Sequence, residues 1–122
     1  MELKHDLVRK ILLYIEENFE CNDLRLASSI KIDGFSTREV LYTCRRLLEA
    51  GFINGKRMSY DNIPDTTVAG LTWEGHEYLD NIRDSGVWKK TKSIASKVGS
   101  VSLSTMGEIA SQVIASIISQ SI

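Results

Sequence analysis

The sequence predicts an α+β fold in which helices predominate. Apolar residues recur at helical spacing in five segments of the chain, and two extended stretches flank its one proline, Pro64. The 122 residues are 43% hydrophobic and 25% charged, which is the composition of an ordinary globular domain. This composition excludes a disordered chain, a collagen-like repeat and a disulfide scaffold. One hydrophobic core is therefore expected.

The first helix is predicted over Asp6–Asn18, with Asp6 as its N-cap. Its apolar residues would share one side of the helix, because they are three or four positions apart. The following segment, Cys21–Phe35, mixes Asn, Asp, Ser and Gly with loosely alternating aliphatic residues, which indicates a loop with one or two short strands. The apolar positions of the helix are Leu7, Ile11, Tyr14 and Ile15.

The clearest boundary in the chain is the start of a helix at Ser36. The Ser36 hydroxyl can accept a hydrogen bond from the third helical residue, Glu39, whose side chain can return one, as in a capping box. The pattern continues to Ala50 and meets Gly51, which adopts the left-handed conformation at a helix end without steric cost. Residue types therefore predict both ends of this helix.

A β-hairpin is predicted after that helix. Its strands would be Phe52–Gly55 and Thr66–Leu71, the second rich in β-branched residues. The polar segment Lys56–Asp65 between them contains the proline, and we expect Asp61 and Asp65 to form turns there.

Two further helices are predicted over Trp73–Arg83, capped by Thr72, and over Val87–Lys97. Aromatic residues near helix starts usually anchor packing, so we expect Trp73 and Trp88 in the core or in helix–helix contacts. The second of these helices is a basic connector, and its lysines are Lys89, Lys90, Lys92 and Lys97.

The last helix is predicted over residues 104–118 and is strongly amphipathic. An apolar stripe of about four turns will not stay exposed to water, so we expect it to join copies of the chain into a homo-oligomer. The alternative is that the helix folds back on its own domain. We expect two domains, residues 1–83 and an extension of residues 84–122. The stripe consists of Met106, Ile109, Ala110, Val113, Ile114, Ile117 and Ile118.

The order of elements is that of a winged helix-turn-helix domain: a helix, an irregular segment, a helix ending in glycine, a hairpin and a further helix. The motifs Leu47–Ile53 (LLEAGFI) and Leu71–Leu79 (LTWEGHEYL) are similar to winged-helix domains in general. The predicted fold is therefore α+β and mainly α: a winged helix-turn-helix domain with a C-terminal amphipathic helical extension.

A narrower resemblance lies in Leu71–His76, Leu79–Asp84 and the pair Val87-Trp88. These segments resemble the uncharacterised bacterial and phage proteins grouped as domain of unknown function 2513, over about residues 4–97. The resemblance implies a winged-helix fold and carries no assigned activity. The segment Cys21–Phe35 is longer than the compact spacing of that fold.

The candidate DNA-binding site is the outer side of the helix that begins after Ser36. If Val40, Cys44, Leu47 and Leu48 face the core, a step of about 100° per residue sends three arginines and a tyrosine to the opposite side. Arginine can pair with guanine and hold phosphates, and two more basic residues are expected at the start of the hairpin loop. The candidate residues are Arg38, Tyr42, Arg45, Arg46, Lys56 and Arg57.

Local charge supports this site only modestly. Residues 36–60 carry a net charge of +3, residues 61–83 carry −4, and the whole chain carries −1. The alternative is an ordinary solvated helix face, on which Glu39 and Glu49 would repel phosphate.

Other site chemistries have little support in the sequence. His5, His76, Cys21 and Cys44 lack the close spacing of metal-ligand pairs, so no metal or other cofactor is expected. The chain also lacks a glycine-rich phosphate loop, a GxSxG or HExxH motif, and paired carboxylates placed against a His or Lys. We therefore expect a protein that is not an enzyme.

The sequence predicts a cytoplasmic protein, since it shows no signal peptide, no membrane-spanning run and no CxxC spacing. The leading hypothesis is a DNA-binding transcriptional regulator of a phage or prophage, with double-stranded DNA as its partner. The alternative is a non-enzymatic interaction module on the same fold that binds a host or phage protein. Membrane docking of the tail is disfavoured, because its polar side carries Ser and Gln instead of Lys and Arg.

Overall fold

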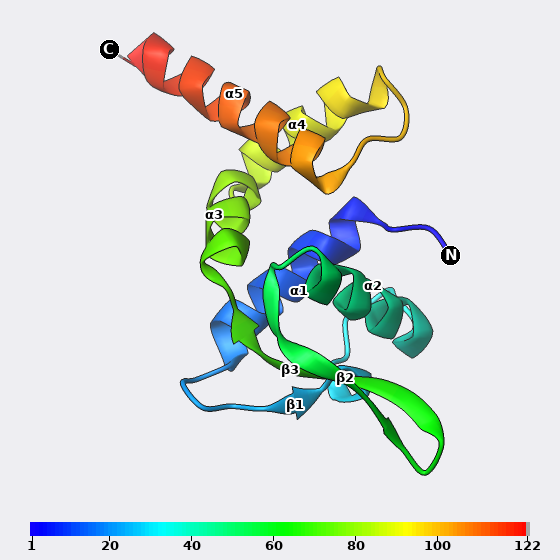
Figure 1. The fold of residues 1–122 in the computed structure, drawn as a ribbon. Helices are drawn as coiled ribbons and strands as arrows, with labels where there is room; N and C mark the ends of the chain where they lie inside the picture. The colour runs from blue at the N-terminus through cyan, green and yellow to red at the C-terminus, as the bar shows by residue number, and fades with distance from the viewer. Residues whose placement is uncertain (122) are drawn as a thin grey trace. The chain divides into compact units, whose positions relative to one another are not determined.

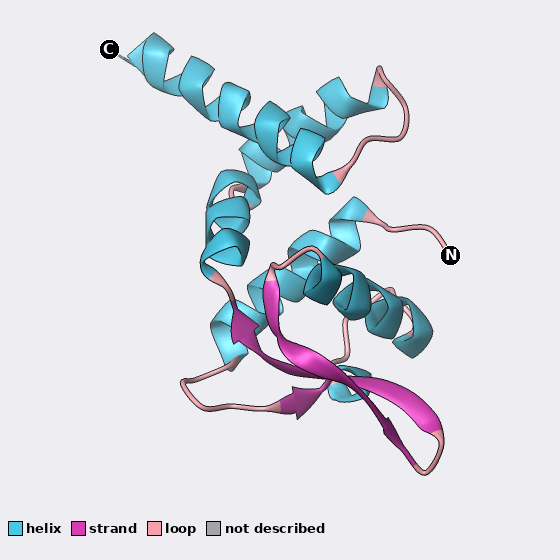
Figure 2. Cartoon of the chain, in the orientation of Figure 1, coloured by secondary structure: helices cyan, strands magenta, loops and turns pink. Residues whose placement is uncertain are grey.

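Five α-helices and a three-stranded antiparallel sheet make up residues 1–121, which are the residues that the computed structural model describes (Figures 1 and 2). The fold is thus mixed α+β and mainly helical, as predicted. The chain divides into two compact units, Met1–His76 and Glu77–Ile122. Compactness alone does not define an independently folding domain, so the division between residues 83 and 84 stays a prediction.

Helix α1 (His5–Asn18) begins one residue earlier than predicted. The expectation that Asp6 is its N-cap is wrong: Lys4 takes the cap position, with extended backbone and no side-chain hydrogen bond. Asp6 instead lies in the first turn, where its negative charge suits the positive end of the helix dipole. The apolar side is buried as expected, at Leu7, Val8, Ile11, Leu12 and Ile15.

The segment after α1 contains one short strand and one short helix. Strand β1 (Arg25–Leu26) pairs antiparallel with Thr67 and Val68 of the central strand. The 3-10 helix η1 (Ala27–Ser29) follows it directly, with Ala27 fully buried. A loop with one or two short strands was predicted here; the structure contains one strand, and the 3-10 helix was not predicted.

Helix α2 (Thr37–Glu49) has the ends that the sequence predicts. Ser36 and Glu39 form the complete capping box, with the Glu39 amide donating to Ser36 Oγ at 3.1 Å and the Ser36 amide donating to Glu39 Oε1 at 3.0 Å. At the other end Gly51 has a φ of +80°, and its amide donates to the Leu48 carbonyl at 3.2 Å. This left-handed glycine turns the chain into the hairpin.

The hairpin strands β2 (Ile53–Tyr60) and β3 (Ile63–Leu71) are longer than predicted. The loop expected over Lys56–Asp65 is wrong, because pairing continues to Tyr60 and Ile63. Asp61 and Asn62 form the turn with φ values of 52° and 64°, and two left-handed residues suit a tight hairpin turn. Strand β3 is central, in the order β1-β3-β2. Pro64 lies beyond the part of β3 that pairs with β1, so its missing N–H breaks no ladder there.

Helix α3 (Trp73–Ile82) is capped by Thr72, whose Oγ1 accepts from the Gly75 amide at 3.0 Å. A Cβ at Gly75 would lie 2.0 Å from the Phe52 carbonyl oxygen, so only glycine fits. The prediction that Trp73 lies in the core is wrong, because its side chain is 73% exposed. Trp73 lies nine residues from the buried Ile82, about 180° around the helix at 3.6 residues per turn.

The second unit contains α4 (Ser85–Ser96) and α5 (Leu103–Ser121), which pack against each other. Asp84 caps α4 by accepting from the Val87 amide at 2.9 Å, so the helix begins two residues earlier than predicted. Trp88 is 4% exposed, which confirms its expected core position. Figure 1 shows α5 as a single helix that continues to the end of the described chain.

Candidate nucleic-acid interface

Helix α2 directs one side to the core and another to solvent. Val40, Cys44 and Leu47 are at most 1% exposed, and Leu48, also expected inside, is only half-buried. On the other side Arg38 is exposed, whereas three neighbours are half-buried because they rest on adjacent groups. These neighbours are Tyr42, Arg45 and Arg46.

The arginines of α2 are held in place by specific contacts. One Arg45 nitrogen donates to the main-chain carbonyl of Asp65 in β3 at 3.3 Å. The Arg46 guanidinium lies 5.2 Å from the centre of the Tyr42 ring, within the range of a cation–π contact, and pairs with Glu49 at 2.9 Å. These two arginines are therefore oriented before any ligand binds.

Lys56 and Arg57 do not lie in a hairpin loop as expected. Both are exposed residues of β2, opposite Thr67 and Thr66 of β3. The correction follows from the longer strand pairing, and it brings Arg57 beside α2. Arg57 Nη2 lies 2.7 Å from Glu49 Oε2, so one carboxylate joins the helix to the hairpin.

Both acidic side chains of α2 are paired with basic residues. The Lys4 ammonium donates to Glu39, and this contact raises the pKa of Lys4 and lowers that of Glu39, which also accepts from the Ser36 amide. Glu49 is paired with Arg46 and Arg57. Paired carboxylates repel phosphate less than free ones, whereas the arginines they hold are less available.

Two of the candidate cations lack such a pairing. Within residues 1–121, Arg38 and Lys56 form no salt bridge. Beside Arg38, a shallow depression of about 270 Å³ is lined by Arg45, Arg46 and Tyr42. This volume is below the usual range for small-molecule sites, and three lining guanidinium groups favour an anionic surface as the ligand.

Asp65 has a role that its sequence position did not reveal. It was expected to form a turn, but it is 7% exposed in β3 and accepts from Ser28 Oγ at 2.5 Å and from the Thr66 amide at 2.7 Å. Its main-chain carbonyl receives Arg45. Asp65 therefore connects β3 to η1 and to α2. Strand alternation would not have indicated this burial, because Thr66 and Val68 are the inward residues of β3 and Asp65 precedes Thr66 directly.

The residues considered for metal binding lie apart. In the described chain, no group of three or more His, Cys, Asp or Glu side chains could hold a metal ion. Cys44 is buried, and burial, reinforced by the negative charge of Asp65, raises the pKa of its thiol to about 12. Cys21 is exposed, and His76 Nδ1 lies 4.0 Å from Glu16.

The apolar stripe of α5 is only partly covered. Met106, Ala110 and Val113 are buried in their own unit, and two further residues of the stripe, Ile109 and Ile114, are half-buried. Ile117 and Ile118 are 48% and 55% exposed. Part of the stripe thus packs within the chain, while self-association through the rest stays a prediction.

The chain belongs to the protein family described as "Hypothetical protein (DUF2513)", whose pattern matches residues 2–102. This match confirms the resemblance to that family which the motifs in residues 71–88 indicate. An "Uncharacterized protein" of Haemophilus influenzae (strain ATCC 51907 / DSM 11121 / KW20 / Rd) is 35% identical over 115 residues, covering 93% of this chain and 96% of that protein. No solved structure matches the chain. None of the helices in residues 1–121 has the length and apolar character needed to cross a membrane.

Proposed function

We propose that this member of the DUF2513 family is a winged-helix DNA-binding protein that regulates transcription. In this proposal α2 enters the major groove and the β2–β3 hairpin is the wing. The order α1, β1, η1, α2, β2, β3 and the sheet order β1-β3-β2 support the fold assignment. The short helix η1 would take the place of the second helix of the motif.

The observation that carries the proposal is the cluster of basic residues where α2 meets β2. Arg45 of α2 donates to the Asp65 carbonyl of β3, and Glu49 joins Arg46 of α2 to Arg57 of β2. A helix and a hairpin that present guanidinium groups together can contact base edges and the neighbouring phosphates at once. Arg38 extends this surface at the start of α2, whereas Lys56 is the strand neighbour of Arg57 and therefore points to the other face of the sheet.

In this proposal Glu49 competes with DNA phosphate for Arg46 and Arg57 and so limits the affinity of the interface. Its pairs with Arg46 and Arg57 are solvent-exposed, since the three side chains are 36% to 57% exposed. Such pairs contribute about 0–1 kcal/mol, so phosphate oxygens can replace the carboxylate at little cost. Binding is then expected to be moderate and strongly dependent on salt.

Binding of fluorescent duplexes at several salt concentrations tests the proposal. The logarithm of the association constant should fall linearly with the logarithm of salt concentration, and Arg38→Ala should reduce the slope by about one unit. Arg83→Ala is the matched control, since Arg83 lies outside the proposed interface and pairs with Asp80 at 2.7 Å. Absence of salt-dependent binding to any duplex would contradict the proposal.

A protein partner is the second candidate function, and the tip of the hairpin favours it. Tyr60 and Ile63 lie opposite each other and are 73% and 66% exposed, with Asp61 in the turn between them. An apolar pair beside an acid suits a protein surface better than a phosphate backbone. Replacing both by serine should abolish capture of such a partner from a bacterial lysate, whereas Val98→Ser, at a residue that is 74% exposed, should not.

We also propose that the chain forms a homo-oligomer through the uncovered edge of α5. Ile114 and Ile118 lie one turn apart on that edge, and Ile118 is 55% exposed. A two-fold pair of chains would present two copies of α2, which suits a palindromic DNA site. Light scattering should report a dimer for the full chain and a monomer for Ile118→Asp. A monomeric wild-type protein at tens of micromolar would exclude this interface.

A further inference from the structure

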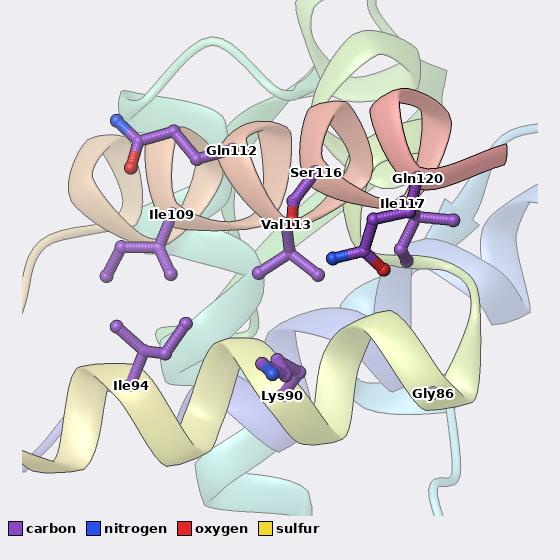
Figure 3. A pocket seen from close by; sticks show the side chains of 9 residues that line it. All are labelled: Gly86, Lys90, Ile94, Ile109, Gln112, Val113, Ser116, Ile117 and Gln120. Carbon is purple, nitrogen blue, oxygen red and sulfur yellow. The ribbon is translucent and has the colours of Figure 1, made fainter. Parts of the chain in front are cut away.

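A groove of about 300 Å³ runs between α4 and α5 inside the second unit (Figure 3). One wall is formed by Gly86, Lys90 and Ile94, which follow one another at intervals of four residues on α4. The facing wall belongs to α5, from Ile109 to Gln120. Helical spacing therefore makes both walls continuous.

The centre of the groove is apolar. Figure 3 shows Ile94 and Ile109 directed toward each other, with Val113 pointing from α5 toward α4. Ile117 continues this surface and is 48% exposed. The aliphatic surface from Ile109 to Ile117 is about 12 Å long at 1.5 Å per residue, enough for an extended chain of about eight carbons.

Lys90 supplies the one formal charge among the nine lining residues. Its ammonium group forms no salt bridge within residues 1–121. The acid of α5, Glu108, lines a different depression, and the Asp84 carboxylate is occupied in capping α4. A single lysine beside an aliphatic surface complements a monovalent anion with an apolar tail.

We propose that this groove binds a free aliphatic carboxylate of about eight carbons. The carboxylate would pair with Lys90 and accept hydrogen bonds from the lining amides, while the tail contacts Ile109, Val113 and Ile117. The length of the aliphatic surface, about 12 Å, matches an extended chain of about eight carbons, as in octanoate. The site is separate from the proposed DNA interface and does not depend on it.

Titration of the full chain with octanoate, followed by amide NMR shifts, tests this site. We expect saturable shifts at Lys90, Ile94 and Val113, with neither acetate nor 1-octanol able to reproduce the affinity, because each lacks one half of the ligand. Lys90→Gln should weaken octanoate binding about tenfold. Lys89→Gln is the matched control, since Lys89 is exposed and does not line the groove.

Ile117→Glu is a second variant, which places a negative charge at a half-exposed lining position without opening the core. It should weaken octanoate binding at least as much as Lys90→Gln while the thermal melting curve stays unchanged. Equal binding by wild type and Lys90→Gln, or equal binding of octanoate and 1-octanol, would overturn the proposal. So would intermolecular NOEs from a second copy of the chain to Ile109 and Val113, because the groove would then already be filled.

Discussion

Helices α2 and α5 are both amphipathic, but the apolar side of α2 is covered more completely than that of α5. Val40 and Leu47 of α2 are at most 1% exposed. In α5 the exposed fraction rises from 1% at Met106 to 48% at Ile117. Helix α2 contacts α1, η1, β2 and β3, whereas α5 contacts chiefly α4.

The difference shows that a stripe of apolar residues predicts a need for burial, while the side chains of the facing element decide how much is buried. Gly86 and Lys90 of α4 line one groove with Ile117 and Gln120 of α5. Gly86 has no side chain and Lys90 is exposed, so they leave the end of α5 only partly covered. The uncovered turns are available for other contacts, and both proposals for the second unit use them.

The largest expected effect comes from a charge placed on each apolar side. Leu47→Asp should abolish cooperative unfolding, because an unpaired carboxylate in the core of the first unit cannot be solvated without opening it. The same change at the half-exposed Ile117 should alter the free energy of unfolding by at most about 0.5 kcal/mol. Thermal melting followed by circular dichroism measures both. A Leu47→Asp protein that melts like wild type would mean that the core side of α2 is wrongly assigned.

Truncation within α5 should separate its covered and uncovered turns. Met106→Ala removes a fully buried side chain and is expected to cost about 2–5 kcal/mol of unfolding free energy. Ile117→Ala should cost well under half as much, since that residue is already half in water. Urea unfolding gives both values, and similar costs at the two positions would show that another chain covers Ile117.

Buried polar groups also distinguish the two units. Asp65→Ala should cost about 1–3 kcal/mol, because it leaves Ser28 and the Thr66 amide without their acceptor. Thr91 of α4 is fully buried but bonds only to the Val87 carbonyl of its own helix, at 2.7 Å. Thr91→Val should therefore cost less than about 1 kcal/mol of unfolding free energy, because the Val87 carbonyl lies within α4 and can still accept a hydrogen bond from the helix backbone. Denaturant titrations that reverse this order would contradict the connecting role of Asp65.

Removing the Glu49 charge should strengthen the proposed binding of α2 to DNA. Glu49→Gln releases Arg46 and Arg57 and should increase duplex affinity severalfold at low salt, with an added salt slope of about one. Stability should change by at most about 1 kcal/mol, since the pairs are exposed. Anisotropy titrations measure the affinity, with Glu108→Gln on α5 as the control. Unchanged affinity would argue that α2 does not face DNA.

The smallest expected effect concerns the Lys4–Glu39 pair. The folded-state pKa of Glu39 is lowered, so its stabilising contribution is present above about pH 4.3 and is lost as pH falls through the lowered value. The pKa of Lys4 is raised, so its contribution is fully present below about pH 10.4 and is lost as pH rises through the raised value. Glu39→Gln should flatten the acid limb of the stability curve slightly. Melting temperatures measured between pH 2 and 6 test this, and an unchanged acid limb would exclude the pair as its source.

The candidate site shows which features of the structure the residue patterns could predict and which they could not. Helical spacing placed the three arginines and Tyr42 of α2 away from its core residues, and the capping box located the start of that helix. The spacing could not show that Glu49 joins Arg46 to Arg57, because this contact depends on the register between β2 and β3. That register follows from the turn at Asp61 and Asn62, which the position of Pro64 obscured.

Local signals determined the ends of α2, the left-handed Gly51 and the apolar sides of α1 and α5, since these depend on residues a few positions apart. Only the tertiary structure decided the roles of Trp73 and Trp88, which lie in the first turns of neighbouring helices but are 73% and 4% exposed. It also decided that Asp65 connects β3 to η1. The physical reason is that burial and hydrogen bonding between distant segments depend on which surfaces meet, and the residues around a position do not record this.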